Sequence, residues 1–239
     1  MGSGIYISTA GAVAQDTALD VAANNIANAA TTGYKAQRVS FGEALANTRS
    51  VDAAFTGVAD MASDSSAGAL RRTDNPLDLA LLGDGYFAVN TPAGVRYTRA
   101  GDFRLDGEGR LVNGAGLVAR GVGGSEIRLP PDATDIGVSK DGQVTAAGET
   151  VGQLELARFT PSALVREGDN LFAAAGPPAA ATGAPTEVIS GAVEGSNVNV
   201  VRGMVDLVKI SRTYESLMRI IHGYGEIESA AARGIGRPR

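Results

Sequence analysis

Apolar residues recur every seven positions near the start of the chain, at Ile5, Ala12, Leu19 and Ile26. This spacing places them on one narrow stripe of an α-helix, so we predict a helix from about residue 4 to residue 29. Many of the other positions in this segment hold alanine or glycine. Small side chains let a neighbouring helix approach closely, so the helix is expected to pack against a partner.

The last part of the chain, from residue 197 to about 232, carries the clearest helical pattern. One apolar set repeats every seven residues and another repeats three places later: Val200, Leu207, Tyr214 and Ile221, then Ile210, Leu217 and Tyr224. These are the a and d positions of a coiled-coil seam. A second apolar line widens the stripe and consists of Val201, Met204, Val205, Val208 and Met218. A helix with two apolar faces needs more than one neighbour.

Short alternating runs of apolar and polar residues replace the helical pattern between Leu77 and about Ala174. Glycine-rich turns separate these runs, and such turns are typical of tight hairpins. We therefore predict a compact all-β domain over residues 76–175. The flanking segments have little periodicity: residues 36–75 are expected to form an extended connector, and residues 176–195 a linker rich in proline and glycine.

These patterns predict an α+β chain, in which an all-β central domain lies between long N- and C-terminal α-helices. Residues 1–35 would hold the first helix and residues 196–239 the second. An isolated amphipathic helix is marginally stable in water, because its stability comes from burying its apolar stripe. We expect the helices to pair with each other or with other copies, to be partly disordered in the monomer, and to form a coiled-coil-like layer on assembly.

The first helix runs into a polar stretch with Asn24, Asn25 and Asn28 and stops near Gly33. Spacings of three and four residues would place the three carboxamides on one stripe of a helix. One interpretation is that these residues end the helix, with Gly33 as the left-handed residue after its last turn. A cap needs only one asparagine, so we favour a packing role for the three, because a buried carboxamide penalises every register that leaves it unpaired.

Composition removes several functional classes. The 239 residues include no cysteine, which excludes disulfides, thiolate metal sites and a cysteine nucleophile. The net charge of -5 argues against a nucleic-acid partner, because phosphate neutralisation needs clustered Lys and Arg. No run approaches the ~20 apolar residues that cross a bilayer, so membrane insertion is not expected. The start lacks signal-peptide features, so export would proceed without signal cleavage.

Enzymatic chemistry finds little support in the sequence. Residues 83–88 and 114–119 have the form G-x-G-x-x-A, but a dinucleotide site needs a helix immediately after the glycines, and strand-like residues follow both. His222 is the only histidine, and we expect it to be packed or at the solvent edge of a helix. We therefore predict no catalysis, no cofactor and no metal.

A secreted calcium-binding β module is an alternative from a different class. Asp102, Asp106 and Glu108 gather around one turn, and Asp132 and Asp135 around another. The twelve-residue calcium loop with its closing bidentate glutamate is absent, however, and Asp-Gly is the ordinary signal of a hairpin turn.

Three motifs in the same order resemble those of the bacterial flagellar rod and hook proteins. They are residues 23–35, residues 73–78 with 83–87, and residues 194–201 followed by Tyr214 and Glu215. Within this family the start, the length and the brief connector are most similar to the proximal rod branch. The distal rod branch, which is usually longer, is the alternative. One departure is Gly203, where relatives commonly carry an acidic residue, and glycine there weakens the helix by ~1 kcal/mol.

The resemblance implies a structural axial protein of the basal body, exported unfolded through the flagellar type III apparatus and polymerised in the periplasm. Its partners would be copies of itself and other rod subunits. The terminal helices would form an inner tube around the export channel, and the rod would pass torque from motor to hook. The residues expected to carry assembly are Asn24, Asn25, Asn28, Gly33, Tyr34, Asn197, Asn199, Leu207, Ile210, Tyr214, Leu217 and Ile221.

Overall fold

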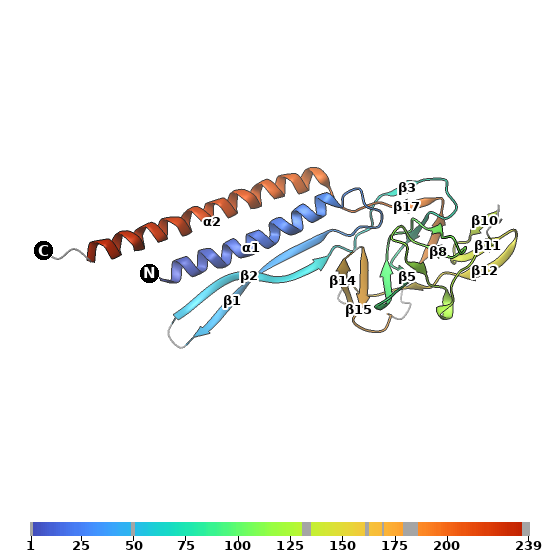
Figure 1. Ribbon diagram of the computed structural model, residues 1–239, viewed down its shortest axis with the longest axis horizontal. Helices are drawn as coiled ribbons and strands as arrows, with labels where there is room; N and C mark the ends of the chain where they lie inside the picture. The colour runs from blue at the N-terminus through green and yellow to red at the C-terminus, as the bar shows by residue number, and fades with distance from the viewer. Residues whose placement is uncertain are drawn as a thin grey trace. The chain divides into compact units, whose positions relative to one another are not determined.

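The computed structural model describes residues 2–48, 51–130, 135–160, 163–168, 170–178 and 186–235 (Figure 1). The chain divides into two compact units. The helical unit consists of Met1–Ala27, Gln37–Asp64 and Asn199–Arg239, and the β unit consists of Asn28–Ala36 and Ser65–Val198. Each unit is therefore built from segments that lie far apart in the sequence.

Two long helices dominate the helical unit, α1 (Gly2–Ala27) and α2 (Val200–Ile235). The sequence predicted helices over about residues 4–29 and 197–232, and both helices are confirmed. No helix within the described ranges combines the length and the hydropathy that crossing a membrane requires.

The two helices run antiparallel and approach each other closely at glycines. A Cβ added at Gly4 would lie 2.6 Å from the hydroxyl oxygen of Tyr224, and one added at Gly203 would lie 3.1 Å from Cγ1 of Ile26. The departure at Gly203 therefore has a local explanation. Because glycine has no side chain, Ile26 has room to pack at this position. This contact offsets the ~1 kcal/mol by which glycine weakens the helix.

The predicted coiled-coil seam of α2 packs against α1, with Leu217 in contact with Gly11. Six of its seven predicted members are half-buried, and Val200, at the start of the helix, is 38% exposed. The six are Leu207, Ile210, Tyr214, Leu217, Ile221 and Tyr224.

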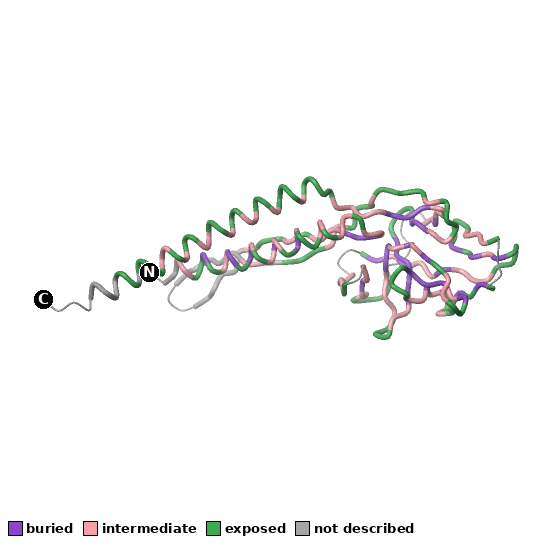
Figure 2. Tube along the Cα trace, turned by 45° about the horizontal axis from the view of Figure 1, so that its top comes forward, coloured by how far each residue is buried: buried purple, intermediate pink, exposed green. Residues whose placement is uncertain are grey.

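Most of the second apolar line is turned away from this seam, since Val201 and Val208 are 75% and 48% exposed, while Met218 is half-buried. Figure 2 shows exposed stretches along α2 in green. α2 thus has two apolar faces, of which α1 covers one.

A two-stranded antiparallel hairpin completes the helical unit, with β1 (Gln37–Thr48) paired to β2 (Val51–Ser63). The sequence predicted an extended connector over residues 36–75, and the structure differs there. Val39 lies opposite Met61 and Phe41 opposite Val58. The two strands pair through their backbone N–H and C=O groups. The segment is rich in alanine and serine, so its sequence pattern showed little sign of the two strands.

Short antiparallel strands make up the β unit, in agreement with the predicted strand-rich centre. They are β3 (Leu70–Arg72), β4 (Leu79–Leu82), β5 (Tyr86–Thr91), β6 (Gly94–Thr98), β7 (Arg104–Leu105), β8 (Leu111–Val112), β9 (Val118–Ala119), β10 (Ile136–Val138), β11 (Gln143–Ala146), β12 (Glu149–Gln153), β13 (Leu156–Ala157), β14 (Leu164–Gly168), β15 (Leu171–Ala174), β16 (Glu187–Ser190) and β17 (Ala192–Glu194). The largest sheet has the order β14-β15-β6-β5-β9-β8-β7, and β13 also pairs with β5. Separate pairings join β10-β11-β12, β16-β4 and β17-β3.

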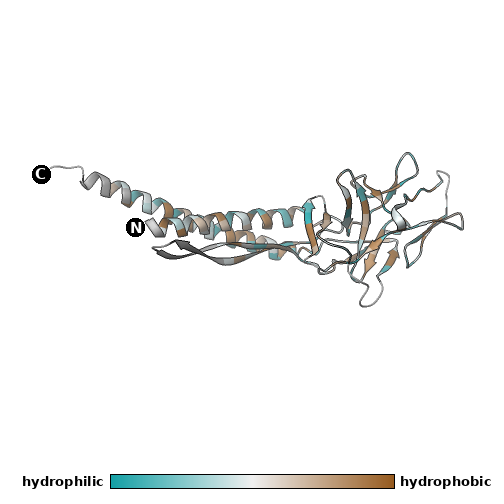
Figure 3. Ribbon diagram, turned by 90° about the horizontal axis from the view of Figure 1, so that it is seen from below, coloured by the Kyte–Doolittle hydropathy of each residue, from teal (hydrophilic) through white to brown (hydrophobic). Residues whose placement is uncertain are grey.

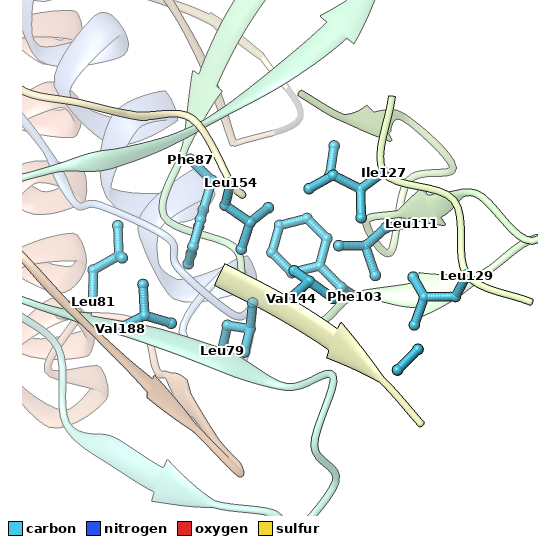
Figure 4. Packing of buried hydrophobic residues seen from close by; sticks show 12 residues of the cluster. Leu79, Leu81, Phe87, Phe103, Leu111, Ile127, Leu129, Val144, Leu154 and Val188 are labelled. Atoms are coloured by element: carbon cyan, nitrogen blue, oxygen red, sulfur yellow. The ribbon is translucent and has the colours of Figure 1, made fainter. Parts of the chain in front are cut away.

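Two hydrophobic clusters of buried residues lie in the β unit: a smaller one of Tyr86, Ala157, Phe159 and Phe172, and a larger one shown in Figure 4. The larger one includes Leu79, Leu81, Phe87, Phe103, Leu111, Ile127, Leu129, Val144, Leu154 and Val188. The rings of Phe87 and Phe103 meet edge to face, with centroids 5.1 Å apart, as aromatic pairs prefer. Figure 3 shows hydrophobic strands in this unit and a mixture of hydrophobic and hydrophilic residues along both helices.

The end of the predicted Pro/Gly-rich linker belongs to the β unit. Within residues 176–195, the structure pairs β16 with β4 and β17 with β3, while residues 179–185 lie outside the described residues. Val188 and Val193 are both 2% exposed, so this part is core strand. These strands are short and follow a stretch rich in proline and glycine. The composition of the whole segment therefore predicted a linker instead of strands.

Replacing Leu217 by alanine is expected to lower the free energy of unfolding of the full-length chain by about 1–3 kcal/mol, because a half-buried leucine loses its packing on α1. The matched variant Val208→Ala removes an exposed side chain from the same helix and should change it by less than about 0.5 kcal/mol. Urea titration followed by helical circular dichroism measures both. Equal losses would contradict the seam described above.

Candidate assembly site

A buried ionic cluster joins segments from both ends of the chain. The Glu194 carboxylate accepts hydrogen bonds from Lys35 Nζ at 2.7 Å and from Arg99 Nη1 at 3.1 Å. Its Oε1 also accepts the backbone N–H of Gly68 at 2.9 Å, and Lys35 Nζ donates to the carbonyl of Ser66 at 2.7 Å. We call these five residues the Glu194 cluster.

The Glu194 cluster is almost completely removed from solvent. The side chains of Lys35 and Glu194 are each 1% exposed, and that of Arg99 is 5% exposed. Taking charges out of water is costly, and their attraction compensates only when the geometry is good and the remaining polar atoms are bonded. Arg99 meets this condition in part: its Nη2 donates to the carbonyl of Gly83 at 2.7 Å, whereas its buried Nε has no hydrogen-bond partner among the described residues. Loss of the carboxylate would leave two buried cations facing each other.

Gly33 fits the segment before Lys35 into the β unit. It has a φ of +67°, the left-handed conformation that the sequence predicted for it. Because α1 ends at Ala27, however, this glycine lies well beyond the helix and is not its cap. Its N–H donates to the Glu194 carbonyl at 2.7 Å, and an added Cβ would lie 2.3 Å from the backbone nitrogen of Ala100. Both the conformation and the close approach require glycine.

Tyr34 is 2% exposed and lies against a cation. The guanidinium carbon of Arg166 lies over its ring, 4.3 Å from the centroid, and Arg166 Nη1 donates to the carbonyl of Lys35 at 2.7 Å. Burial raises the pKa of the Tyr34 hydroxyl, while the charge of Arg166 and a hydrogen bond to it act in the opposite direction. The contact is therefore a cation over a neutral phenol ring, desolvated inside this chain's own β unit.

Asn25 ties the start of β1 to the end of α1. Its Nδ2 donates to the Gln37 carbonyl and its Oδ1 accepts the Gln37 N–H, both at 2.8 Å. A carboxamide that satisfies both backbone groups of one residue fixes the local register of the chain. Asn24 differs from it, since it is exposed and donates to the carbonyl of Asp20 in its own helix at 3.0 Å.

Asn28 and Asn199 lie at helix boundaries. Asn28 follows the last residue of α1, and its Oδ1 accepts a hydrogen bond from the Thr31 hydroxyl at 3.2 Å. Asn199 precedes α2, and its Oδ1 accepts the N–H of Arg202 at 3.0 Å, which is an N-cap. The single helical stripe of three carboxamides that the sequence predicted is therefore not formed, because the helix ends before Asn28.

Asn197 joins the motifs at the two ends of the chain. Its Oδ1 accepts the N–H of Ala36 at 2.7 Å, and its own N–H donates to the carbonyl of Tyr34 at 3.3 Å. Its Nδ2 donates to the carbonyl and the hydroxyl of Ser66, both at 3.1 Å. Asn197 and the Glu194 cluster thus hold the same two segments together.

The predicted assembly residues therefore separate into two groups. Gly33, Tyr34 and Asn197 surround the Glu194 cluster in the β unit, as the contacts above show. The five seam residues of α2 and Asn24, Asn25 and Asn199 belong to the helical unit, and Asn28 begins the β unit. An assembly role for any of them stays a prediction.

Lys35, Glu194 and Arg99 are not among the residues that the sequence patterns predicted. For two of them a signal was present. Lys35 is the only charged residue in residues 23–35, Glu194 is the only charged residue in residues 194–201, and their charges are opposite. Arg99 stands among many β-domain arginines, and nothing in its local sequence distinguishes it.

Two acidic residues of the calcium alternative, Asp106 and Glu108, stabilise a turn. Asp106 Oδ1 accepts the N–H groups of Glu108 and Arg110, and its Oδ2 accepts from Arg110 Nε at 2.7 Å. Glu108 also pairs with Arg110, at 2.6 Å. Asp132 lies outside the described residues. Within the described part of the chain, no group of three or more His, Cys, Asp and Glu residues is placed to hold a metal ion.

Strands follow both glycine-rich segments that resembled nucleotide loops. β5 begins directly after residues 83–85 and β9 follows residues 114–116, as the sequence predicted. A pyrophosphate would therefore find no helix N-terminus there. His222 lies on the exposed side of α2, at the solvent edge of the helix.

Three family profiles match the chain in sequence order. They are described as Flagella basal body rod protein at residues 5–35, Flagellar hook protein FlgE/F/G D1 domain at residues 80–146, and Flagellar basal body rod FlgEFG protein C-terminal at residues 189–233. The two outer matches contain the motif residues that meet at the Glu194 cluster.

Curated relatives resemble the chain over nearly its whole length. The flagellar basal-body rod protein FlgF of Rhizobium meliloti is 30% identical over 223 residues, which cover 92% of each chain. FlgF of Caulobacter vibrioides is 31% identical over 243 residues, covering 99% of each. The flagellar basal-body rod protein FlgG of Bacillus subtilis is 34% identical over 254 residues, covering 93% of this chain and 95% of the relative.

Glu194→Gln removes the only carboxylate of the Glu194 cluster and is expected to lower the free energy of unfolding by about 3–5 kcal/mol, because Lys35 and Arg99 stay buried without a counter-charge. The matched variant Glu187→Gln breaks a largely exposed pair with Lys140 and should cost less than about 1 kcal/mol. Urea unfolding measured by the strand signal in circular dichroism compares the two. Similar costs would show that the cluster does not stabilise the β unit.

Gly33→Ala is expected to cost well over the ~1 kcal/mol of a left-handed alanine, because its Cβ would also overlap the backbone at Ala100. Gly83→Ala is the matched variant: φ there is +88°, and an added Cβ would meet nothing within 4 Å. Only the backbone penalty of ~1 kcal/mol should appear at Gly83. Thermal unfolding of both variants measures the difference, and equal shifts would refute the steric argument.

Proposed function

This chain belongs to the flagellar basal-body rod protein family and is a structural subunit of the rod, and we propose that it takes the proximal, FlgF-type position. The observation that carries this proposal is alignment length. The match to Caulobacter FlgF covers 99% of both chains in 243 positions, against 239 residues in this chain. The match to Bacillus FlgG needs 254 positions to cover 93% of this chain, so it contains more gaps. The distal, FlgG-type position is the alternative.

The exposed faces of the helical unit support an assembly role. A chain that polymerises must present apolar surface that only another subunit covers. α2 has such a face beside its α1 seam, with Val201 and Met204 exposed, and α1 has another with Tyr6 and Val13 exposed. We propose that these faces become buried when the helices of many copies form a coiled-coil-like inner layer, which encloses the channel and transmits torque.

The predicted assembly residues are proposed to act at two levels. Leu207, Ile210, Tyr214, Leu217 and Ile221 hold α2 on α1 and so build the helical unit that assembles. Asn25, Asn199 and Asn28 fix where the helices begin and end, and Gly33, Tyr34 and Asn197 anchor the adjoining segments. Asn24 is exposed, and we propose that it contacts a neighbouring subunit.

The partners that follow from the family are other rod subunits and copies of the chain itself. We further propose export by the flagellar type III apparatus without signal cleavage, followed by assembly in the periplasmic part of the basal body. The proposed role requires no catalysis, cofactor, nucleic acid or membrane insertion. Its physical demands are a rigid subunit and specific contacts with neighbours.

The proximal position predicts a specific content of partly built basal bodies. In the bacterium that carries this gene, deletion of the distal rod protein should leave short rods that still contain this chain, because proximal subunits are added first. Deletion of this chain should abolish motility and leave no distal rod protein in purified basal bodies. Mass spectrometry of both preparations provides the measurement. Finding this chain only in strains with a complete rod would overturn the proximal assignment and favour the distal one.

A further inference from the structure

An apolar groove lies along one side of α1, within the helical unit. It has a volume of about 570 Å³ and is lined by Tyr6, Thr9, Ala10, Val13, Ala14 and Thr17 of α1 together with Gly57 and Val58 of β2. Tyr6 and Val13 are 67% and 63% exposed. Residues 6, 10, 13 and 17 follow helical spacing, so they form one face of α1, distinct from the buried positions Ala12 and Ala18.

The same face of α1 changes from apolar to acidic towards its C-terminus. Asp16 and Asp20 continue the spacing of Val13 and are exposed. They are the only charged residues between Gly2 and Ala27. None of the ion pairs found among the described residues involves either carboxylate.

On its exposed side, α2 carries a strip of residues that changes from apolar to mostly basic towards the C-terminus. Val201, Met204, Val205 and Val208 form the apolar part and are 48% to 75% exposed. Arg212 and Arg219 continue the strip at helical spacing and are exposed as well, and the exposed Glu215 lies on the same strip between them. From Lys209 to Arg219 the helix carries three positive side chains and one negative side chain, Glu215.

The two surfaces match in the length of their apolar parts and in the position of the first charge after them. The apolar parts, from Tyr6 to Val13 and from Val201 to Val208, each span about 10 Å of helix. The first carboxylate follows three residues after Val13, and the first guanidinium on the strip follows four residues after Val208. Side by side in the same direction, apolar residues would face apolar residues and Asp16 would lie close to Arg212.

We propose that the α1 groove of one copy binds the exposed strip of α2 of a second copy, with the two helices parallel. This inference rests on the proposed function, because it assumes that copies of the chain assemble side by side in a rod. It names the surfaces that would meet.

Parallel packing follows from the charges. In the opposite direction Arg212 would lie near the N-terminus of α1, where the helix dipole is positive and no carboxylate is present. Within one chain α1 and α2 are antiparallel, so the contact between copies differs in kind from the seam already described. Each copy would offer a groove to one neighbour and a strip to the next, and such a heterologous contact continues as a helical polymer unless it closes into a ring.

Disulfide crosslinking in assembled rods tests the direction of packing, since the chain has no cysteine of its own. A strain without the native gene expresses two copies, one Val13→Cys and the other Val208→Cys. A second strain pairs Tyr6→Cys with Val201→Cys. The matched controls exchange the partners, pairing Val13→Cys with Val201→Cys and Tyr6→Cys with Val208→Cys. Misaligned cysteines would be ~10 Å apart, too far for a disulfide, so the first two strains should give several-fold more crosslinked dimer.

The outcomes separate the inference from the proposed function. If the wild-type chain is missing from purified basal bodies, the proposed function fails. If the variants assemble into rods but dimers are absent, or appear mainly in the exchanged pairs, the proposed function stands and the parallel groove contact is overturned. Equal crosslinking in all four strains also overturns it.

A charge exchange supplies a second measurement that introduces no cysteine. Asp16→Lys and Arg212→Glu should each reduce swimming in soft agar several-fold, and the double variant should recover most of it, because the ion pair is restored with reversed sign. Circular dichroism of each purified variant checks that the helices are retained. Single variants that swim normally, or a double variant that swims no better than the worse single variant, would contradict the proposal.

Discussion

The burial of Glu194 between Lys35 and Arg99 is the constraint on which the β unit depends. Lys35 and Glu194 are separated by 159 positions in the sequence, yet their charged atoms lie 2.7 Å apart. A buried charge without its partner is far less stable than the pair, so the unit reaches its low-energy state only when both segments are in place. The strand-rich centre of the chain therefore includes residues 28–36 and the strands up to Glu194, which lie outside the boundaries predicted for it.

This arrangement gives the motifs at the two ends a structural role inside one subunit. Gly33, Tyr34 and Asn197 are engaged with this chain's own backbone and with Arg166. The surfaces proposed to contact neighbours are on the helical unit, where one apolar face of α2 packs on α1 and the other is exposed. In this proposal, internal stability and contact with other subunits depend on different residues, so a subunit can fold into one defined shape and still present apolar surface to others.

Glycines allow α1 and α2 to approach each other closely in the helical unit. Gly4, Gly11 and Gly203 each lie against a larger side chain of the other helix, Tyr224, Leu217 and Ile26 respectively. Glycine weakens a helix, and the closer packing of the two helices offsets that loss. The result is a helix pair whose stability comes from its partner, as expected for amphipathic helices.

The sequence by itself determined the two helices, the seam of α2 with its second apolar face, the left-handed Gly33 and the strand-rich centre. Each of these features depends on residues that are close together in the sequence, so a local pattern predicts it. Its motifs also pointed to the rod family. Only the tertiary structure decided the β1–β2 hairpin, the strands β16 and β17, the separate contacts of Asn24, Asn25 and Asn28, and the Glu194 cluster. Those features depend on residues that meet across long stretches of chain, and local periodicity carries no information about which backbone groups or charges will meet.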